Sequence, residues 1–220
     1  MIIQIADALS KEQVARLRST LAQDGAGFSS GKATAGWYVK DIKHNDQASG
    51  ALAEQVVQEV KKALLAHPVF LSAARPKEFV KLLVSRYRPG MSYGTHVDDA
   101  LMGGKRTDMS FTLFLAGEES YVGGELVIEG NDGDSVIRLP PGSLVLYPTT
   151  SLHRVNEVTR GERLAVVGWV RSFIRSPEQR ETLFDLDQAI AGLQGAGVAR
   201  AVSDRVFKVR NNLTRMWAED

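Results

Sequence analysis

The chain of 220 residues contains no cysteine. Disulfide bonds, thiolate nucleophiles and cysteine-ligated zinc sites are therefore excluded together. Any metal ion that this protein binds must be held by nitrogen and oxygen ligands. The lack of cysteine also agrees with a cytoplasmic location, which is the one we expect.

Long apolar runs and an excess of one charge are also missing. No apolar run approaches the roughly 20 residues that a membrane helix needs, and the first residues, MIIQIADALSKEQ, have neither the basic nor the apolar segment of a secretion signal. The 27 Lys and Arg residues against 26 Asp and Glu residues leave a formal net charge of +1. We therefore expect a protein that binds neither nucleic acid nor membranes.

The pattern of apolar residues divides the chain into three parts, residues 1–78, 79–175 and 176–220. In the first part, MIIQI predicts a strand, Ser10 and Gln13 fit a helix capping box, and apolar residues every four positions predict a second amphipathic helix. The second part consists of short apolar or alternating runs separated by Gly, Pro and Asp, which is typical of a β-sandwich or barrel.

The third part is helical in pattern. Ser176 and Pro177 fit an N-cap followed by a first-turn proline, and two glycines, Gly195 and Gly197, are predicted to separate two helices. We interpret these helices either as a packing surface or as a dimer surface, and only the second would make the protein a homo-oligomer. Their basic residues are interpreted as a solvated helix face: Arg205, Lys208, Arg210 and Arg215.

Histidine is scarce, with four in the chain, and one of them lies close to a carboxylate in YGTHVDD, residues 93–99. On an extended strand, residues i and i+2 project from the same face, so His96 and Asp98 can present an imidazole and a carboxylate to one point. An H-x-D pair is common, however. A metal site needs at least one further ligand from elsewhere in the chain.

Only one other histidine opens a strand candidate of the β region. His44 lies in the polar stretch KHND, where we expect it to be exposed, and His67 lies at a predicted helix end. His153, in SLHRVNEV, is the remaining candidate. With His96 and Asp98 it would complete a set of two histidines and one carboxylate, which non-haem Fe(II) oxygenases use. Such a set leaves coordination positions for a cosubstrate and O₂.

An arginine that can anchor an anion follows ten residues after His153. Arg163 opens RLAVVGWV, and a charge at a buried strand start is costly unless it is paired. The planar guanidinium binds a carboxylate through two parallel hydrogen bonds. The alternative is a strand-edge arginine in solvent, which we expect for Arg160 and Arg171. We interpret Arg163 as the anchor for the remote carboxylate of a 2-oxo acid.

Taken together, YRPGMSYGTHVDD (87–99), LHRV (152–155) and RLAVVGW (163–169) resemble the prolyl hydroxylase-type branch of the 2-oxoglutarate- and Fe(II)-dependent dioxygenases. More narrowly, the chain resembles the bacterial PKHD-type hydroxylases over essentially its whole length. The resemblance implies an α+β fold with a double-stranded β-helix (jelly roll) core, N-terminal flanking helices and a helical C-terminal extension. It also implies hydroxylation of a C–H bond in an unidentified substrate, a small molecule or a protein side chain, while 2-oxoglutarate is decarboxylated to succinate.

The resemblance further implies which residues hold the cofactors. His96, Asp98 and His153 fall on the Fe(II) ligands, and Arg163 falls on the anchor of 2-oxoglutarate. L-ascorbate, which restores iron to Fe(II), and a link to iron homeostasis are associated with the family. The carboxylate of Asp98 favours hydroxylation, because related halogenases lack this ligand and place halide there.

Three aromatic residues match pocket residues of relatives: Tyr87, Tyr93 and Trp169. One position departs from the pattern. Phe114 stands where some eukaryotic relatives have a tyrosine that also binds the remote carboxylate, and phenylalanine cannot donate a hydrogen bond. Arg163 therefore needs another helper, for which Ser110 and Thr112 are the candidates.

Two other interpretations remain open. One is a different metalloenzyme of the same fold class that uses the same three ligands, such as an isomerase or a zinc hydrolase, but it leaves Arg163 and Tyr87 unexplained. The other is a non-catalytic jelly-roll module that binds metal or senses iron. Release of succinate from 2-oxoglutarate would separate both from the dioxygenase.

Overall fold

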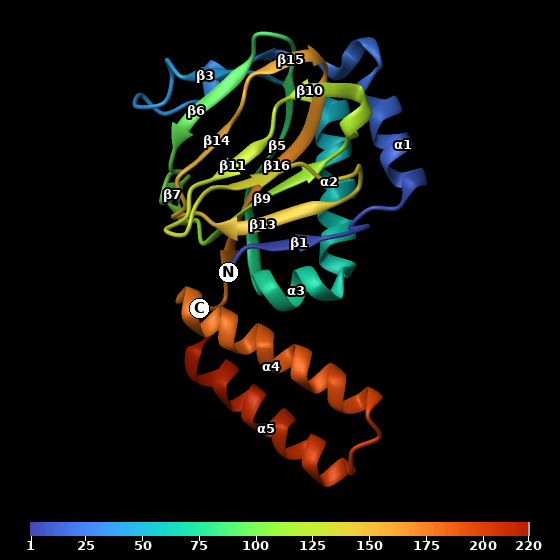
Figure 1. Ribbon diagram of the computed structural model, residues 1–220, viewed down its shortest axis with the longest axis vertical. Coiled ribbons are helices and arrows are strands. Elements are labelled where there is room, and N and C mark those ends of the chain that lie inside the picture. Colours follow the sequence, from blue (N-terminus) through green and yellow to red (C-terminus); the bar gives the residue numbers. More distant parts are fainter. Residues whose placement is uncertain (220) are drawn as a thin grey trace.

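The computed structural model describes residues 1–219 and has the expected α+β jelly-roll architecture (Figure 1). Two antiparallel sheets face each other, with the strand orders β1-β13-β9-β16-β5-β4-β2 and β12-β11-β14-β6-β3. Asp220, the last residue of the predicted extension, lies outside the described residues.

The strands are short except for two that run through the middle of the larger sheet. The larger sheet consists of β1 (Ile3–Ile5), β2 (Ser29–Ser30), β4 (Asp46–Gln47), β5 (Pro76–Tyr87), β9 (Met109–Phe114), β13 (Leu144–Pro148) and β16 (Arg163–Ser172). The smaller sheet consists of β3 (Lys43–His44), β6 (Ser92–His96), β11 (Leu126–Ile128), β12 (Ser135–Ile137) and β14 (His153–Val155). Two further pairs are β7 (Leu101–Met102) with β8 (Lys105–Arg106), and β10 (Tyr121–Gly123) with β15 (Val158–Gly161).

Three helices cover the outer side of the larger sheet (Figure 1): α1 (Lys11–Leu21), α2 (Ala51–Ala66) and α3 (Pro68–Ala74). The capping box that opens α1 is confirmed, since Ser10 and Gln13 bond reciprocally. Along α2, Val56, Val60 and Leu64 are fully buried. Burying each such side chain stabilises the fold by about 1.5–3 kcal/mol. The face of the larger sheet that α2 covers is therefore part of the hydrophobic core.

The opposite face of the larger sheet is turned toward the smaller sheet, and β9 illustrates how one strand serves both sides. Phe111 packs against Phe70 of α3, with ring centroids 6.0 Å apart. The alternating residues Ser110 and Thr112 line the cavity between the sheets instead. Because successive residues of a strand point to opposite faces, polar side chains within this apolar run are aimed at the site.

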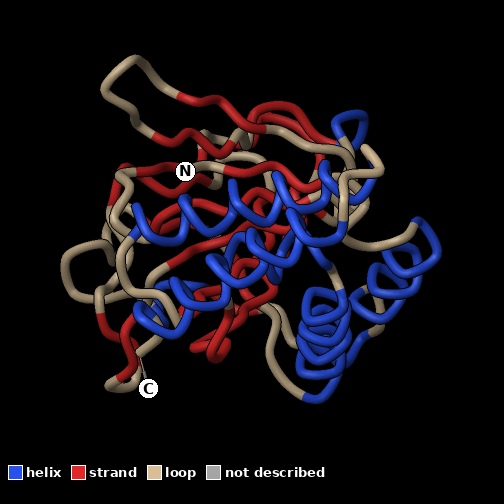
Figure 2. Tube along the Cα trace, turned by 90° about the horizontal axis from the view of Figure 1, so that it is seen from below, coloured by secondary structure: helices blue, strands red, loops and turns tan. Residues whose placement is uncertain are grey.

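The helical extension is a hairpin of α4 (Pro177–Gly195) and α5 (Arg200–Trp217) that projects from the β core (Figure 1). Seen from below, its two helices lie side by side (Figure 2). The predicted N-cap at Ser176 and the separation of the helices at the glycines are both confirmed. Within the described residues, no helix is long and apolar enough to cross a membrane.

An ion-pair network attaches the hairpin to the rest of the protein. Asp187 of α4 accepts hydrogen bonds from Arg75 at 2.7 Å and from Arg210 of α5 at 2.9 Å. The interpretation of Arg210 as part of a solvated basic face is therefore wrong, because its guanidinium joins the two helices. The other three residues of that face are exposed, as expected.

The larger sheet contains strands from more than one of the three predicted parts of the chain. Its strands β1, β2 and β4 come from residues 1–78: β1 pairs with β13, β4 pairs with β5, and β2 pairs with β4. The first part therefore contributes directly to the β core. The division into 1–78, 79–175 and 176–220 stays a proposal about chain organisation.

Candidate active site

Three predicted metal ligands converge in the cavity between the sheets. His96 ends β6 and His153 opens β14, and the two are direct cross-strand partners. Asp98 lies between them in space: its two carboxylate oxygens are each 3.8 Å from the Nε2 atom of one histidine. One ligand atom from each residue lies within 4.8 Å of the others. This spacing suits a single metal ion.

The backbone differs from the expected one at this point. The strand ends at His96, and Asp98 follows in an irregular segment. The carboxylate is therefore not presented by strand alternation alone. It is held by Ser110, whose hydroxyl donates to Asp98 Oδ2 at 2.7 Å and lies 3.1 Å from Thr149 Oγ1. Ser110 is thus placed beside the carboxylate ligand and is not the helper of Arg163.

Both imidazoles are held in the tautomer that a metal site requires. Nδ1 of His96 lies 2.8 Å from the carbonyl oxygen of Gly94, and Nδ1 of His153 lies 3.0 Å from that of Ser151. A carbonyl oxygen only accepts, so both Nδ1 atoms carry the proton and both Nε2 lone pairs are free for a metal. Burial, followed by the neighbouring charge of His153, lowers the pKa of His96 to about 4. The ring is consequently neutral at neutral pH, as metal binding demands.

Arg163 is a buried cation without an acceptor. Its side chain is 1% exposed, and its Nε, Nη1 and Nη2 atoms have no hydrogen-bond partner among the described residues. Its guanidinium carbon lies 5.3 Å from the ring centroids of both Tyr87 and Phe114. Cation–π contacts offset part of the desolvation, but five N–H donors remain without an acceptor. The arrangement fits an anion that enters the cavity, and excludes the solvent-exposed alternative for Arg163.

Comparisons with known proteins agree with this geometry. Residues 82–171 match the 2OG-Fe(II) oxygenase superfamily, and residues 178–219 match the PKHD-type hydroxylase C-terminal domain. The PKHD-type hydroxylase Mmar10_1675 of Maricaulis maris is 52% identical over 100% of both chains, and a PKHD-type hydroxylase of Parvibaculum lavamentivorans is 48% identical over 100% of both. The chain belongs to the PKHD-type hydroxylases. It is an Fe(II)- and 2-oxoglutarate-dependent hydroxylase.

Solved structures support the fold of this PKHD-type hydroxylase. A prolyl-4-hydroxylase of Pseudomonas putida has a TM-score of 0.56 at 21% identity, over 78% of this chain and 92% of that one. A prolyl hydroxylase of Trichoplax adhaerens, solved with a peptide fragment of hypoxia inducible factor, has a TM-score of 0.56 at 18% identity, over 83% and 86% of the two chains. At such identities the likeness concerns the fold alone.

The predicted pocket aromatics all line the same cavity, whose volume is about 550 Å³. Tyr93 stacks on His96, with ring centroids 3.7 Å apart and planes inclined by 19°. Tyr87 pairs with Arg163 across β5 and β16. Trp169 lies farther along β16, and its buried Nε1 has no acceptor in the part of the chain that the structure describes. A cavity of this size is typical of small-molecule sites, about 300–1,000 Å³. The other two histidines lie outside it: His44 is exposed, and His67 caps α3.

Sequence reasoning missed Tyr147, which is almost fully buried beside the ligands. Its ring centroid lies 5.2 Å from that of His153. Burial, with a smaller contribution from the charge of Asp98, raises the pKa of Tyr147 well above its usual value, and its side chain hydrogen-bonds with Thr112. Thr112 is thereby engaged with this phenol. The alternation of SLVLYP could have marked Tyr147 as inward-facing.

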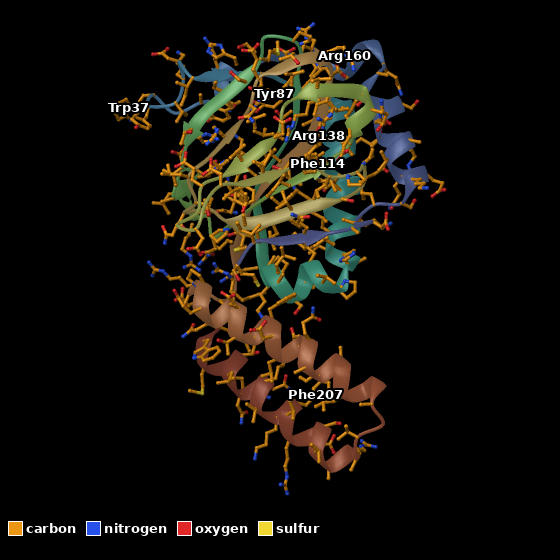
Figure 3. All side chains as sticks on the ribbon, viewed as in Figure 1. Trp37, Tyr87, Phe114, Arg138, Arg160 and Phe207 are labelled. Carbon is orange, nitrogen blue, oxygen red and sulfur yellow. The ribbon has the colours of Figure 1, made fainter. Side chains whose placement is uncertain are left out.

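Two lysines and an exposed aromatic residue were also missed. Lys43 of β3 and Lys81 of β5 line the cavity, although neither lies in a recognisable motif. Trp37 lies at the rim, where it is 90% exposed. Figure 3 shows Trp37 at the outer edge of the β core, whereas Tyr87 and Phe114 lie within it.

Two glycines, Gly123 and Gly124, lie at an irregularity of the β10–β15 pair, where the pairing register shifts between Val122 and Gly123. The second glycine has a direct relation to the anchor. Gly124 has a φ of +69°, and a Cβ atom there would lie 3.0 Å from Cδ of Arg163 and 2.8 Å from Cγ2 of Val158. A residue without a side chain leaves room for the stem of Arg163 in this conformation.

Proposed function

We propose that His96, Asp98 and His153 bind one Fe(II) and that Arg163 binds the C5 carboxylate of 2-oxoglutarate in the same cavity. The donor set is the one preferred by non-haem Fe(II) oxygenases. Both histidines are oriented for it by their backbone partners, which is the usual arrangement around a protein-bound metal.

A single observation carries the proposal: a fully buried arginine, which has no acceptor among the described residues, shares a cavity with the three ligands. A fold that kept this arginine for stability alone would supply an acceptor, because an unpaired buried charge is strongly destabilising. A dicarboxylate supplies it. One carboxylate of 2-oxoglutarate meets the guanidinium, and the 2-oxo acid end is left to meet the metal.

Bound Fe(II) and 2-oxoglutarate would supply the oxidation itself: one oxygen atom of O₂ enters succinate as 2-oxoglutarate loses CO₂, and the other enters the C–H bond of the substrate. The protein positions the ligands and excludes water from the cavity. Ser110 orients the Asp98 carboxylate through a hydrogen bond of 2.7 Å. Tyr93 restricts rotation of the His96 ring by stacking on it. Rings of Tyr87 and Phe114 flank the Arg163 guanidinium and shield it from water.

The retained carboxylate favours hydroxylation over halogenation. Asp98 takes a ligand position on the metal that would otherwise be open to a halide. We therefore propose that the product is an alcohol formed at a C–H bond of the substrate.

The test is succinate formation measured by mass spectrometry. Under air, with Fe(II), 2-oxoglutarate and ascorbate, the parent protein should release succinate slowly even without substrate, through uncoupled turnover. Asp98→Gly should reduce this to background, and Lys62→Met, on the exposed side of α2, should not. Equal succinate with and without O₂, or none in air across plausible substrates, would leave the dioxygenase assignment unsupported and favour a metal-binding module.

Two further properties, the use of L-ascorbate and a link to iron homeostasis, are proposed from membership of the family. We propose that L-ascorbate sustains turnover by restoring Fe(II), which is tested by omitting it. We also propose a link to iron homeostasis, tested by the abundance of the protein under iron limitation. Self-association through the α4–α5 hairpin stays a prediction for sedimentation analysis.

A further inference from the structure

Two positively charged side chains, Lys43 and Lys81, line the cavity from opposite sheets. Lys43 belongs to β3 of the smaller sheet, and Lys81 belongs to β5 of the larger sheet. Neither is used by the proposed binding of Fe(II) or 2-oxoglutarate. Their position relative to the metal ligands and to Arg163 decides what they can bind.

The register of the larger sheet places Lys81 on the metal side of the cavity. Tyr87 is opposite Arg163, whereas Lys81, six residues earlier on β5, is opposite Trp169. At roughly 3.3 Å per residue, the separation along the strand is about 20 Å. Lys81 therefore begins at the opposite end of the cavity from Arg163, and the carboxylate that Arg163 binds is not its partner.

The pairing of β9 with β16 also places Lys81 near the metal ligands. Ser110 of β9 is opposite Trp169 of β16, and Ser110 holds the metal ligand Asp98. Lys81, Trp169 and Ser110 therefore form one row across three strands, at the level of the metal ligands. A substrate whose C–H bond faces the metal would lie at this level.

Lys43 approaches the same region from the smaller sheet. It is opposite Tyr93 in the pairing of β3 with β6, and its Nζ lies 5.2 Å from the centroid of the Tyr93 ring. That ring is stacked on the metal ligand His96. Lys43 is only 6% exposed, although its one hydrogen-bond acceptor is the neutral hydroxyl of Thr34, at 3.1 Å.

Neither lysine has an anionic partner within residues 1–219. No ion pair includes either of them, and the charge of Lys81 opposes protonation of Lys43. Asp98 and Asp99 act in the opposite direction. Asp98 is committed to the metal site, and Asp99 is exposed at the rim. Two ammonium groups with so little compensation create a positive potential on the substrate side of the cavity.

We propose that Lys43 and Lys81 form an oxyanion subsite, and that the substrate carries a carboxylate or phosphate group close to the C–H bond that is hydroxylated. This inference rests on the proposed function, because it takes Arg163 to be occupied by 2-oxoglutarate. The Nε1 donor of Trp169, which has no acceptor in the described structure, lies in the same row and completes the subsite. A cationic group would be repelled, and a neutral acceptor would bond to these donors without a compensating negative charge, so both are disfavoured.

The experiment measures anion preference with Arg163 already occupied. The protein is loaded with Zn(II), which does not support turnover, and with saturating 2-oxoglutarate, whose binding is verified first by calorimetry. Benzoate, phenyl phosphate, benzamide and benzylamine are then titrated, since they share a ring and differ in charge. The variants are Lys81→Met, Lys81→Glu and Lys43→Met, with Lys62→Met as the control for an exposed lysine.

The parent and Lys62→Met should bind benzoate or phenyl phosphate at least about tenfold more tightly than benzamide, as expected for a charge-assisted hydrogen bond. Lys81→Met should lose most of this preference, although the metal is still present, and Lys81→Glu should favour benzylamine. Lys81 is partly exposed, so its variants test the subsite even where Lys43→Met fails to fold.

Equal affinities for benzoate and benzamide in the parent would overturn the subsite. So would an anion preference that survives in Lys81→Glu, because the metal alone would then explain it. Failure of 2-oxoglutarate to bind in the first titration would instead reject the proposed function, so the two failures are distinguishable.

Discussion

Replacing Arg163 by methionine should stabilise the ligand-free protein and at the same time abolish tight binding of 2-oxoglutarate. Most substitutions of a fully buried residue destabilise a protein. Here the expected sign is reversed, because the guanidinium is buried and its three nitrogen atoms have no hydrogen-bond partner within residues 1–219. Methionine is unbranched and apolar, and it can follow the path of the arginine stem.

The magnitude follows from opposing contributions. Burying an ion costs several kcal/mol even after relaxation, and each of the two ring contacts at 5.3 Å returns up to about 2 kcal/mol. Removing the charge should therefore stabilise the apoprotein by about 1–3 kcal/mol, and each kcal/mol raises Tm by about 2–4 °C for a chain of this size. Loss of two charge-assisted hydrogen bonds, about 1.5–3 kcal/mol each, should weaken 2-oxoglutarate binding at least about a hundredfold.

Arg180 offers a matched control. It is 2% exposed, but its Nη1 donates to the carbonyl oxygens of Ile174 and Arg175, both at 2.8 Å. Arg180→Met leaves these acceptors without a donor and should lower stability by about 1–3 kcal/mol, while 2-oxoglutarate affinity is kept.

Scanning calorimetry without metal or 2-oxoglutarate measures Tm for the parent and both variants, and titration of 2-oxoglutarate into the Zn(II)-loaded proteins measures affinity. A fall in Tm for Arg163→Met as large as that for Arg180→Met would show that the fold satisfies Arg163 by itself. Parental affinity in Arg163→Met would remove its role as the anchor.

Three further outcomes follow from the site. His153→Ala should keep the fold and lose most of its affinity for Zn(II) or Mn(II), and calorimetry that finds parental affinity would reject this ligand. Ser110→Ala should reduce metal affinity or succinate formation by about 10–100-fold, as is usual when a ligand loses its orienting partner; no change would mean that Asp98 is held without it. Burial, with the charge of Lys81 second, lowers the pKa of Lys43 from 10.5 to about 8, so this lysine is charged below pH 8 and neutral above it. Benzoate affinity should then decline as the pH rises through about 8, and Lys43→Met should remove this step; a flat profile in the parent would contradict the expectation.

Much of the candidate site follows from local rules. H-x-D spacing brings an imidazole and a carboxylate close together through the strand period. Three other histidines were available as a third ligand, and of these His153 opened a predicted strand of the β region. Arg163 stood out because a charge that begins an apolar strand needs a partner. Capping residues such as Ser10 and Ser176 also predicted helix starts correctly. Their hydrogen bonds reach only three residues along the chain, so the local sequence is enough to predict them.

Strand pairing decided the remaining features. His96 and His153 meet because β6 and β14 pair in one register, and a shift by one residue would turn one ring to the opposite face. The hydrogen bond from Ser110 to Asp98 joins β9 of the larger sheet to the irregular segment that follows β6, so neither sequence neighbourhood records it.

The sequence by itself determined the chemistry available to this protein: nitrogen and oxygen ligands without sulfur, a histidine–aspartate pair, and an arginine at the start of an apolar strand. Only the tertiary structure decided that Arg163 lacks an acceptor, because that depends on every residue packed around it and not on its neighbours in the chain. The same holds for Lys43 and Lys81. They lie in different sheets and share one cavity, since the two sheets close face to face and their inward side chains meet in the space between.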